Sequence, residues 1–248
     1  MQVTPTMRGS FFAGIKAGTL GGILYVGGIA VFNVLLLYAL KASVLSAIST
    51  AYPQSCPMVP NVNGSAEDCF SSVVAVDVPF IAFVAFFITL AYSGIFGMYY
   101  DSLPSRGPTI KGLLFGAIIG FNLIFFGFSG YIFDSESASA TALLMVVWTP
   151  VFGFLLGRLY RKYTRRVEFS SQDPLLLKVI VDGRDITGKA RTFAATSSHK
   201  VRADVAEDAS FKEWEPSGGI TLEDTRSFET TMEVNGDGSI KGIVGPKY

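Results

Sequence analysis

Four long stretches of the chain contain no charged residue, and this limits the possible fold more than any other feature of the sequence. They cover residues 17–40, 78–100, 112–133 and 137–157, about 21 to 24 residues each. A helix rises about 1.5 Å per residue, so roughly 20 residues cross a hydrocarbon core about 30 Å thick. The sequence therefore predicts four transmembrane helices at these positions.

The Lys and Arg residues beside these stretches lie almost entirely on one predicted side. Only Lys41 lies on the other side. The positive-inside rule places the basic side in the cytoplasm, so both termini are predicted to be cytoplasmic. The basic residues on that side are Arg8, Lys16, Arg106, Lys111, Arg158, Arg161, Lys162, Arg165 and Arg166.

Composition indicates a membrane part joined to a soluble part. Half of the 248 residues are hydrophobic and the mean hydropathy is +0.43, which is high for a soluble domain and low for a chain that lies wholly in the membrane. The 20 basic and 20 acidic residues balance, so no overall field favours nucleic acid. No metal cluster, cofactor fingerprint or hydrolase signature is found. We expect no cofactor, no nucleic-acid partner and no enzymatic activity.

Residues 43–76, between the first two predicted helices, form a predicted extracytoplasmic loop. The loop holds both cysteines, Cys56 and Cys69, and the glycosylation sequon Asn63-Gly64-Ser65. Disulfides persist outside the cytoplasm, and closing about a dozen residues stabilises a protein by roughly 3 kcal/mol. We expect a Cys56–Cys69 disulfide and glycosylation of Asn63. Two free thiols and a chance sequon are the alternative.

Beyond the membrane part, residues 1–166, the pattern changes from helix to strand. Residues 170–174 are predicted to be a linker. Three runs with strand character follow, over residues 176–181, 200–205 and 230–234, with turn pairs at Asp182-Gly183 and Asn235-Gly236. The predicted fold is a four-helix membrane bundle of two tandem hairpins, followed by a small cytoplasmic all-β domain over residues 170–248.

Glycines recur every fourth residue in the first and third predicted helices. Such a stripe lets a neighbouring backbone approach closely in lipid, so we expect these helices to pack centrally. A pore lining is the functional alternative. The glycines are Gly14, Gly18 and Gly22 in one helix and Gly112, Gly116 and Gly120 in the other.

The second and fourth helices end alike, with a glycine three residues before a tyrosine. The pairs are Gly97 with Tyr100 and Gly157 with Tyr160. Together with the glycine stripes, this indicates a parallel internal repeat of two hairpins. Near these ends, Asp101 is predicted to form a small ion pair with Arg106. The only histidine, His199, is expected to be an exposed residue of a loop or strand edge.

The tail resembles a known module. Phe211-Lys212-Glu213-Trp214, Ser217-Gly218-Gly219-Ile220, Thr230 to Val234 and Gly236-Asp237-Gly238 are similar to the bacterial repeat domain related to the internalin B repeat. The resemblance implies that Phe211 and Trp214 lie in the core of the β domain, and that Thr230, Thr231 and Gly238 are core or turn positions. It departs from the family at Glu213, where glycine is usual. Such modules do no chemistry and usually decorate secreted or surface proteins, whereas the charge asymmetry favours the cytoplasm.

The membrane part is similar to uncharacterised prokaryotic four-helix membrane proteins. The similarity consists of a lysine before a glycine-rich helix and the end motif Gly97-Met98-Tyr99-Tyr100-Asp101. It implies a fold and no activity. The expected function is a multi-pass membrane scaffold or accessory subunit whose β domain docks a partner. The alternative is a small oligomeric channel or carrier with a glycine-lined path. The expected partners are the lipid bilayer and other membrane proteins or further copies of the chain.

Overall fold

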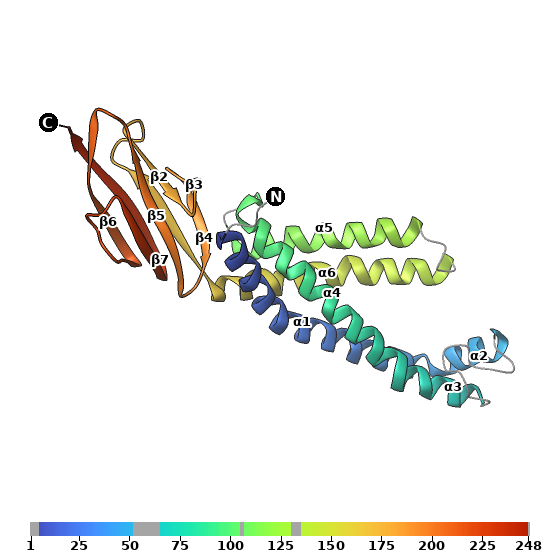
Figure 1. The fold of residues 1–248 in the computed structure, drawn as a ribbon. Helices are drawn as coiled ribbons and strands as arrows, with labels where there is room; N and C mark the ends of the chain where they lie inside the picture. The colour runs from blue at the N-terminus through green and yellow to red at the C-terminus, as the bar shows by residue number, and fades with distance from the viewer. Residues whose placement is uncertain (1–4, 52–64, 105–106, 130–134, 248) are drawn as a thin grey trace. The chain divides into compact units, whose positions relative to one another are not determined.

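The computed structural model describes residues 5–51, 65–104, 107–129 and 135–247 (Figure 1). They form a helical N-terminal part followed by a curled, mixed β sheet. Two compact units are distinguished. One comprises residues 19–92, and the other comprises residues 1–18 together with residues 93–248.

Helices occupy most of each predicted membrane stretch within the described residues: the first helix ends one residue before the end of the first stretch, and the helix over the third stretch is described as far as Ser129. Two segments, Ser10–Ala39 and Ala66–Ser102, are long and apolar enough to cross a membrane. The helices of the described residues are α1 (Pro5–Ala39), α2 (Lys41–Ala51), α3 (Ala66–Ser72), the π-helical η1 (Val73–Asp77), α4 (Val78–Tyr99), the 3-10 turn η2 (Tyr100–Ser102), α5 (Pro108–Ser129) and α6 (Ser135–Tyr163). Pro150 lies inside α6 without ending it.

The unit of residues 19–92 contains much of the predicted loop. The described part of that loop is helical, because α2 and α3 lie within residues 41–72. A capping box begins α3: the Ser65 amide donates to Asp68 Oδ2 at 2.8 Å, and Ser65 Oγ accepts from the Asp68 amide at 3.4 Å. Lys41 pairs with Glu67 at 3.0 Å. The two short helices are therefore joined by a polar contact as well as by the chain.

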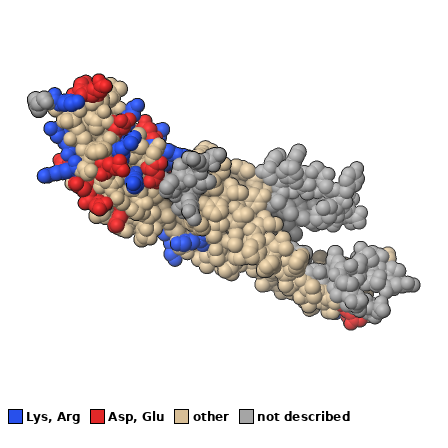
Figure 2. Space-filling view, viewed as in Figure 1, with Lys and Arg blue, Asp and Glu red and all other residues tan. Residues whose placement is uncertain are grey.

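Large apolar side chains are exposed mainly on the helices. In the described part of the chain, only Leu175 and Phe228 are exposed in the sheet region, whereas α1, α4 and α5 expose many, including Phe80 and Phe83, which are 66% and 61% exposed. Figure 2 shows the charged side chains gathered over the sheet, with the helices largely uncharged. An apolar outer surface of this kind suits contact with lipid.

Seven strands form the sheet of residues 164–246, in the order β3-β2-β5-β7-β1-β4, with β6 also paired to β7. The parallel pairing of β1 with β7 makes the sheet mixed. The strands are β1 (Thr164–Ser171), β2 (Leu177–Val181), β3 (Arg184–Asp185), β4 (Ala190–Ala194), β5 (Ser197–Val205), β6 (Ala209–Leu222) and β7 (Glu229–Pro246).

The three predicted β runs are strands, but two details of the prediction are wrong. The expected linker at residues 170–174 begins inside β1, which pairs with β7 through Ser171. The expected turn at Asn235-Gly236 is absent, because β7 runs through it to Pro246. The pairing of β6 with β7 is instead irregular at Gly218 of β6, which has a φ of +67° and precedes a register shift. The turn at Asp182-Gly183 is present, with both residues at positive φ.

The core of the sheet follows from alternation along its strands. Val201 and Ala203 of β5 are buried, and their neighbours Lys200 and Arg202 are exposed. Trp214 is 2% exposed, and its indole N–H donates to the Ser227 carbonyl at 3.0 Å. Phe211 packs against this core from a partly buried position. The large apolar residues of the sheet thus face inward.

Candidate functional site at the junction of helices and sheet

The glycine-tyrosine ends of α4 and α6 meet in an aromatic layer. The Tyr100 and Tyr160 ring centroids lie 4.6 Å apart, and the Phe96 ring lies 5.4 Å and 5.3 Å from them. Tyr160 is fully buried, and its hydroxyl donates to the Gly97 carbonyl at 3.3 Å. The two copies of the motif are therefore packed against each other.

Glycines bring the helix backbones together below this layer. A Cβ on Gly14 of α1 would clash with the Ser93 carbonyl of α4, and one on Gly97 would clash with the Ser10 carbonyl. In the other pair, Gly112 and Gly116 of α5 face Gly153 of α6, and a Cβ on Gly116 would lie 3.1 Å from the Gly153 Cα. These close contacts join α1 to α4 and α5 to α6, and the central packing of the first and third helices stays a prediction.

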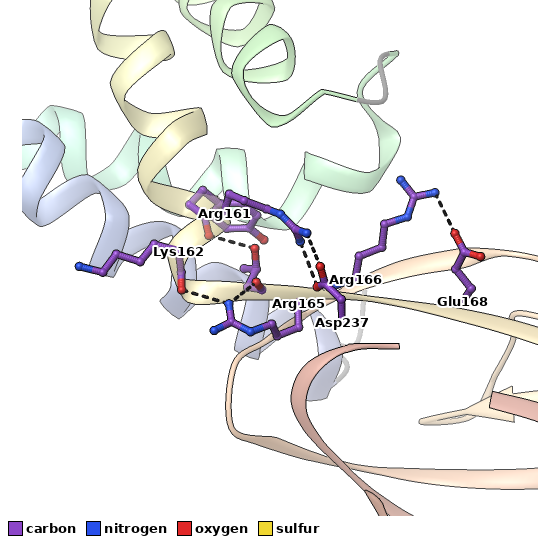
Figure 3. A network of polar contacts seen from close by, with 8 residues as sticks. Arg161, Lys162, Arg165, Arg166, Glu168 and Asp237 are labelled. Carbon is purple, nitrogen blue, oxygen red and sulfur yellow. Dashed lines mark hydrogen bonds and ion pairs between the residues drawn. The ribbon is translucent and has the colours of Figure 1, made fainter. Parts of the chain in front are cut away.

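An acidic residue of β7 joins the sheet to the end of α6. The Asp237 carboxylate accepts from both terminal nitrogens of Arg161, at 3.2 Å for Nη1, and from the Arg166 amide at 2.7 Å (Figure 3). Burial raises the pKa of Asp237, but the hydrogen bonds from Arg161 and Arg166 outweigh this effect and hold the pKa below its ordinary value. Because α6 ends at Tyr163 and β1 begins at Thr164, these contacts link the last turn of the helix and the start of β1 to β7.

A second acidic residue joins the end of α4 to the edge of the sheet. Asp101 accepts from the Thr192 amide at 2.9 Å and from the Thr192 hydroxyl at 2.7 Å. Thr192 lies in β4, the last strand of the sheet order, so Asp101 occupies part of an open edge. The predicted partner of Asp101, Arg106, lies outside the described residues.

A polar cavity of about 330 Å³ lies between these two junctions. The end of α4, the start of α5, the end of α6 and the strands β1 and β4 all contribute to its wall. Three of its lining side chains are basic and one is acidic. The lining residues are Tyr100, Asp101, Leu103, Pro108, Lys111, Arg161, Thr164, Arg166, Ala190 and Thr192.

Lys111 is the most buried charge of this cavity. It is 7% exposed. Its ammonium donates to the Tyr100 carbonyl at 2.6 Å and lies 4.3 Å from the centroid of the Tyr100 ring. Within residues 5–51, 65–104, 107–129 and 135–247, no carboxylate lies within 4.0 Å of this ammonium. A carbonyl and an aromatic face are thus its closest partners there.

A second polar cluster lies in the sheet, and the sequence did not reveal it. His199 Nδ1 is 2.8 Å from Asp182 Oδ2, and His199 Nε2 is 2.8 Å from Ser197 Oγ. His199 is 6% exposed, so its predicted exposure is wrong. Ser197 and His199 are two residues apart on one face of β5, whereas Asp182 comes from the turn after β2, and only the pairing of β2 with β5 brings it close.

The order Asp, His, Ser in this cluster is that of a hydrolase triad. However, Ser197 Oγ also donates to the Ala194 carbonyl at 2.6 Å, and the neighbouring cavity of about 560 Å³ is lined by Ser198 and His199 but not by Ser197. Asp182 additionally accepts from the Lys200 amide at 3.2 Å. The geometry is that of a buried network that ties two turns together.

The remaining predicted site residues have varied positions. Cys56 and Asn63 lie outside the described residues, so the disulfide and the glycosylation stay predictions, and Cys69 is buried in α3. Gly22 faces Thr89 and Phe86 of α4, and Gly18 and Gly120 are buried. Among the residues described, no cluster of three His, Cys, Asp or Glu side chains has the arrangement of a metal site.

Comparisons with protein-family models, with curated proteins and with solved structures find no match to this chain.

Proposed function

We propose that this protein is a multi-pass membrane scaffold or accessory subunit. Four helices anchor it as a bundle of two hairpins, both termini are cytoplasmic, and the β domain docks a partner protein. Its membrane anchoring is supported by two helical segments of sufficient length and hydropathy and by the apolar surface of the helices.

The observation that carries the proposal is the polar junction between helix ends and sheet. Asp237 holds β7 to Arg161 at the end of α6, and Asp101 at the end of α4 holds Thr192 of β4. A domain attached by a flexible linker would sample many orientations. A domain fixed at two separate strands presents one face in a constant direction, which is what a docking platform requires.

The outer face of β2, β5 and β7 is the best candidate for the docking surface. It contains the cavity of about 560 Å³, and Lys200, Arg202 and Glu229 line it. The free edges suit strand addition poorly: β3 has two residues, Asp101 occupies part of β4, and β6 has two register shifts and carries Pro216. We therefore place docking on side chains of this face, which we call the β5 groove.

The alternative function, a channel or carrier with a glycine-lined path, has less support. The neighbouring backbone lies so close to Gly14, Gly112 and Gly116 that an added Cβ would clash with it. No path for a solute can therefore run along these three glycines. Flux of ions or small solutes through liposomes that contain the purified protein would favour the channel and contradict the scaffold.

Orientation is tested with a cysteine introduced at Ser170, which is exposed in β1. A maleimide that cannot cross membranes should label this cysteine only after cell lysis, with the unaltered protein as the control for the native cysteines. Labelling in intact cells would place the β domain outside and refute the proposed threading.

Docking is tested by site-specific photo-crosslinking in membranes of the native host. A crosslinking residue at Ser198, in the β5 groove, should give one defined product, and the Lys200→Glu and Arg202→Glu substitutions should abolish it. The control is the same crosslinking residue at Glu215, on β6 and away from the groove. Equal products from both positions, or none from Ser198, would contradict docking at this face.

A further inference from the structure

The cavity at the start of α5 is lined by three basic side chains and one acidic side chain, and one of the basic side chains is buried. Lys111 is 7% exposed and lines this cavity. An ammonium group has three donors, and the Tyr100 carbonyl takes one of them. Buried charges in proteins are normally paired, because removing a charge from water is costly unless an opposite charge replaces the water.

The other charges of the cavity leave a positive surplus. Both oxygens of Asp101 accept from Thr192, and Arg161 is committed to Asp237. Arg166 makes a long contact to Glu168, at 3.6 Å, and the two side chains are 47% and 65% exposed. Lys111 and Arg166 are therefore the two cations available to a ligand. Asp101 lines the same cavity and offsets part of the charge of Lys111, which leaves an excess of positive charge for an anion.

The cavity also has the size and the helix orientation of a ligand site. Its volume of about 330 Å³ lies at the lower end of the roughly 300–1,000 Å³ that is usual for small-molecule sites. Pro108, the first residue of the 22-residue helix α5, lines it, so the positive end of the α5 dipole is directed at the same space. Thr164 and Thr192 line the same wall, and their hydroxyls donate to the Tyr160 carbonyl and to Asp101.

We propose that this cavity binds a phosphate group, held by Lys111 and Arg166. The phosphate is either the headgroup of an anionic lipid or a free phosphate ion. A lipid source rests on the proposed membrane function, because that threading puts the cavity at the cytoplasmic headgroup level, where basic pockets between helices hold anionic lipids. A free phosphate source does not depend on the threading.

The test uses the full chain in a neutral detergent. Inorganic phosphate should raise the melting temperature of the unaltered protein in a concentration-dependent way, because a ligand that binds only the folded state stabilises it. The Lys111→Gln substitution should weaken phosphate binding by about tenfold or more, since one charge-assisted contact is lost. Lys162→Gln is the matched control: it removes the same charge from the last turn of α6, and Lys162 does not line the cavity.

Because Lys111 is buried, its substitution could also impair folding, so Arg166→Gln provides a second variant. The Arg166 side chain is 47% exposed, and its backbone amide still donates to Asp237 in the variant. It should weaken phosphate binding in the same direction. Unchanged binding in folded Arg166→Gln protein, an equal loss in Lys162→Gln, or no response of the unaltered protein to phosphate would overturn the proposal.

Native mass spectrometry from nanodiscs distinguishes the two sources. Retention of one phosphatidylglycerol in preference to phosphatidylcholine, lost in Arg166→Gln and displaced by free phosphate, identifies a lipid headgroup site. Phosphate stabilisation without phosphatidylglycerol retention identifies a free phosphate site. The second result leaves the scaffold proposal standing, whereas liposome flux would refute the scaffold without affecting the phosphate site.

Discussion

The helical part and the sheet use opposite residue types for close packing. In the helices, glycines meet the facing backbone and large side chains such as Phe80 point outward. In the sheet, large side chains such as Trp214 and Phe169 fill the interior, and the outward residues are charged. The proposed membrane anchoring accounts for the difference: lipid gives no hydrophobic drive between helices, so backbone proximity stabilises them, whereas water drives the apolar residues of the sheet inward.

The largest effect is expected from emptying the interior of the sheet. Trp214→Ala should destabilise the β domain by about 3–5 kcal/mol, because it leaves a cavity among fully buried neighbours. Phe228→Ala removes a ring that is 59% exposed and should change stability by less than about 0.5 kcal/mol. Chemical unfolding followed by backbone circular dichroism, which does not depend on tryptophan fluorescence, measures the free energy of unfolding of both variants. Similar losses would show that the sheet lacks a tightly packed interior.

A single methyl group should break the packing of α5 with α6. Gly153→Ala places a Cβ against the Gly112 carbonyl and should destabilise the pair by about 1–3 kcal/mol, seen as a lower melting temperature in detergent. Gly27→Ala is the matched control, because no atom lies within 4 Å of its added Cβ. That control should be neutral or slightly stabilising, since alanine favours helix. Equal effects would mean that glycine spacing has no packing role here.

The buried network of the sheet should be sensitive to the loss of its central member. His199→Ala removes a hydrogen-bond partner of the buried Asp182 carboxylate and should cost about 1–3 kcal/mol. Ser198→Ala, one residue away and exposed, serves as the control. Thermal unfolding of the two variants compares them. A neutral His199→Ala would show that the network does not stabilise the two turns.

The smallest effect is expected at the junction itself. Asp237→Asn should cost at most about 1 kcal/mol, because the Asp237 side chain is 48% exposed. Since the folded-state pKa is below the ordinary 3.8, this contribution is present above that pH and is lost as pH falls through the folded-state pKa. The difference in melting temperature between the unaltered protein and Asp237→Asn should therefore be constant above about pH 5 and shrink as the pH falls below about 4. A difference that stays constant would exclude the Asp237 charge as its source.

Local pattern was sufficient for the elements but not for their partners. Charge-free runs predicted the positions of α1, α4, α5 and α6, and alternation predicted the strands that contain Val179, Val201 and Met232. The turn pair Asn235-Gly236 misled the prediction. In the sheet its glycine lies against Gly219 of β6, and this close approach needs glycine within a continuous strand.

The sequence by itself determined the apolar spans, the glycine spacing, the repeated glycine-tyrosine ends and the alternating strands, because each depends on neighbours a few residues away. Only the tertiary structure decided what meets at the junction. Asp101 and Thr192 are 91 positions apart, and Arg161 and Asp237 are 76 apart. The burial of Lys111 likewise depends on the packing of three helix ends and two strands, which no periodicity records. Contacts between residues so far apart in sequence form only when the fold brings the two segments together. The candidate site consists of such contacts.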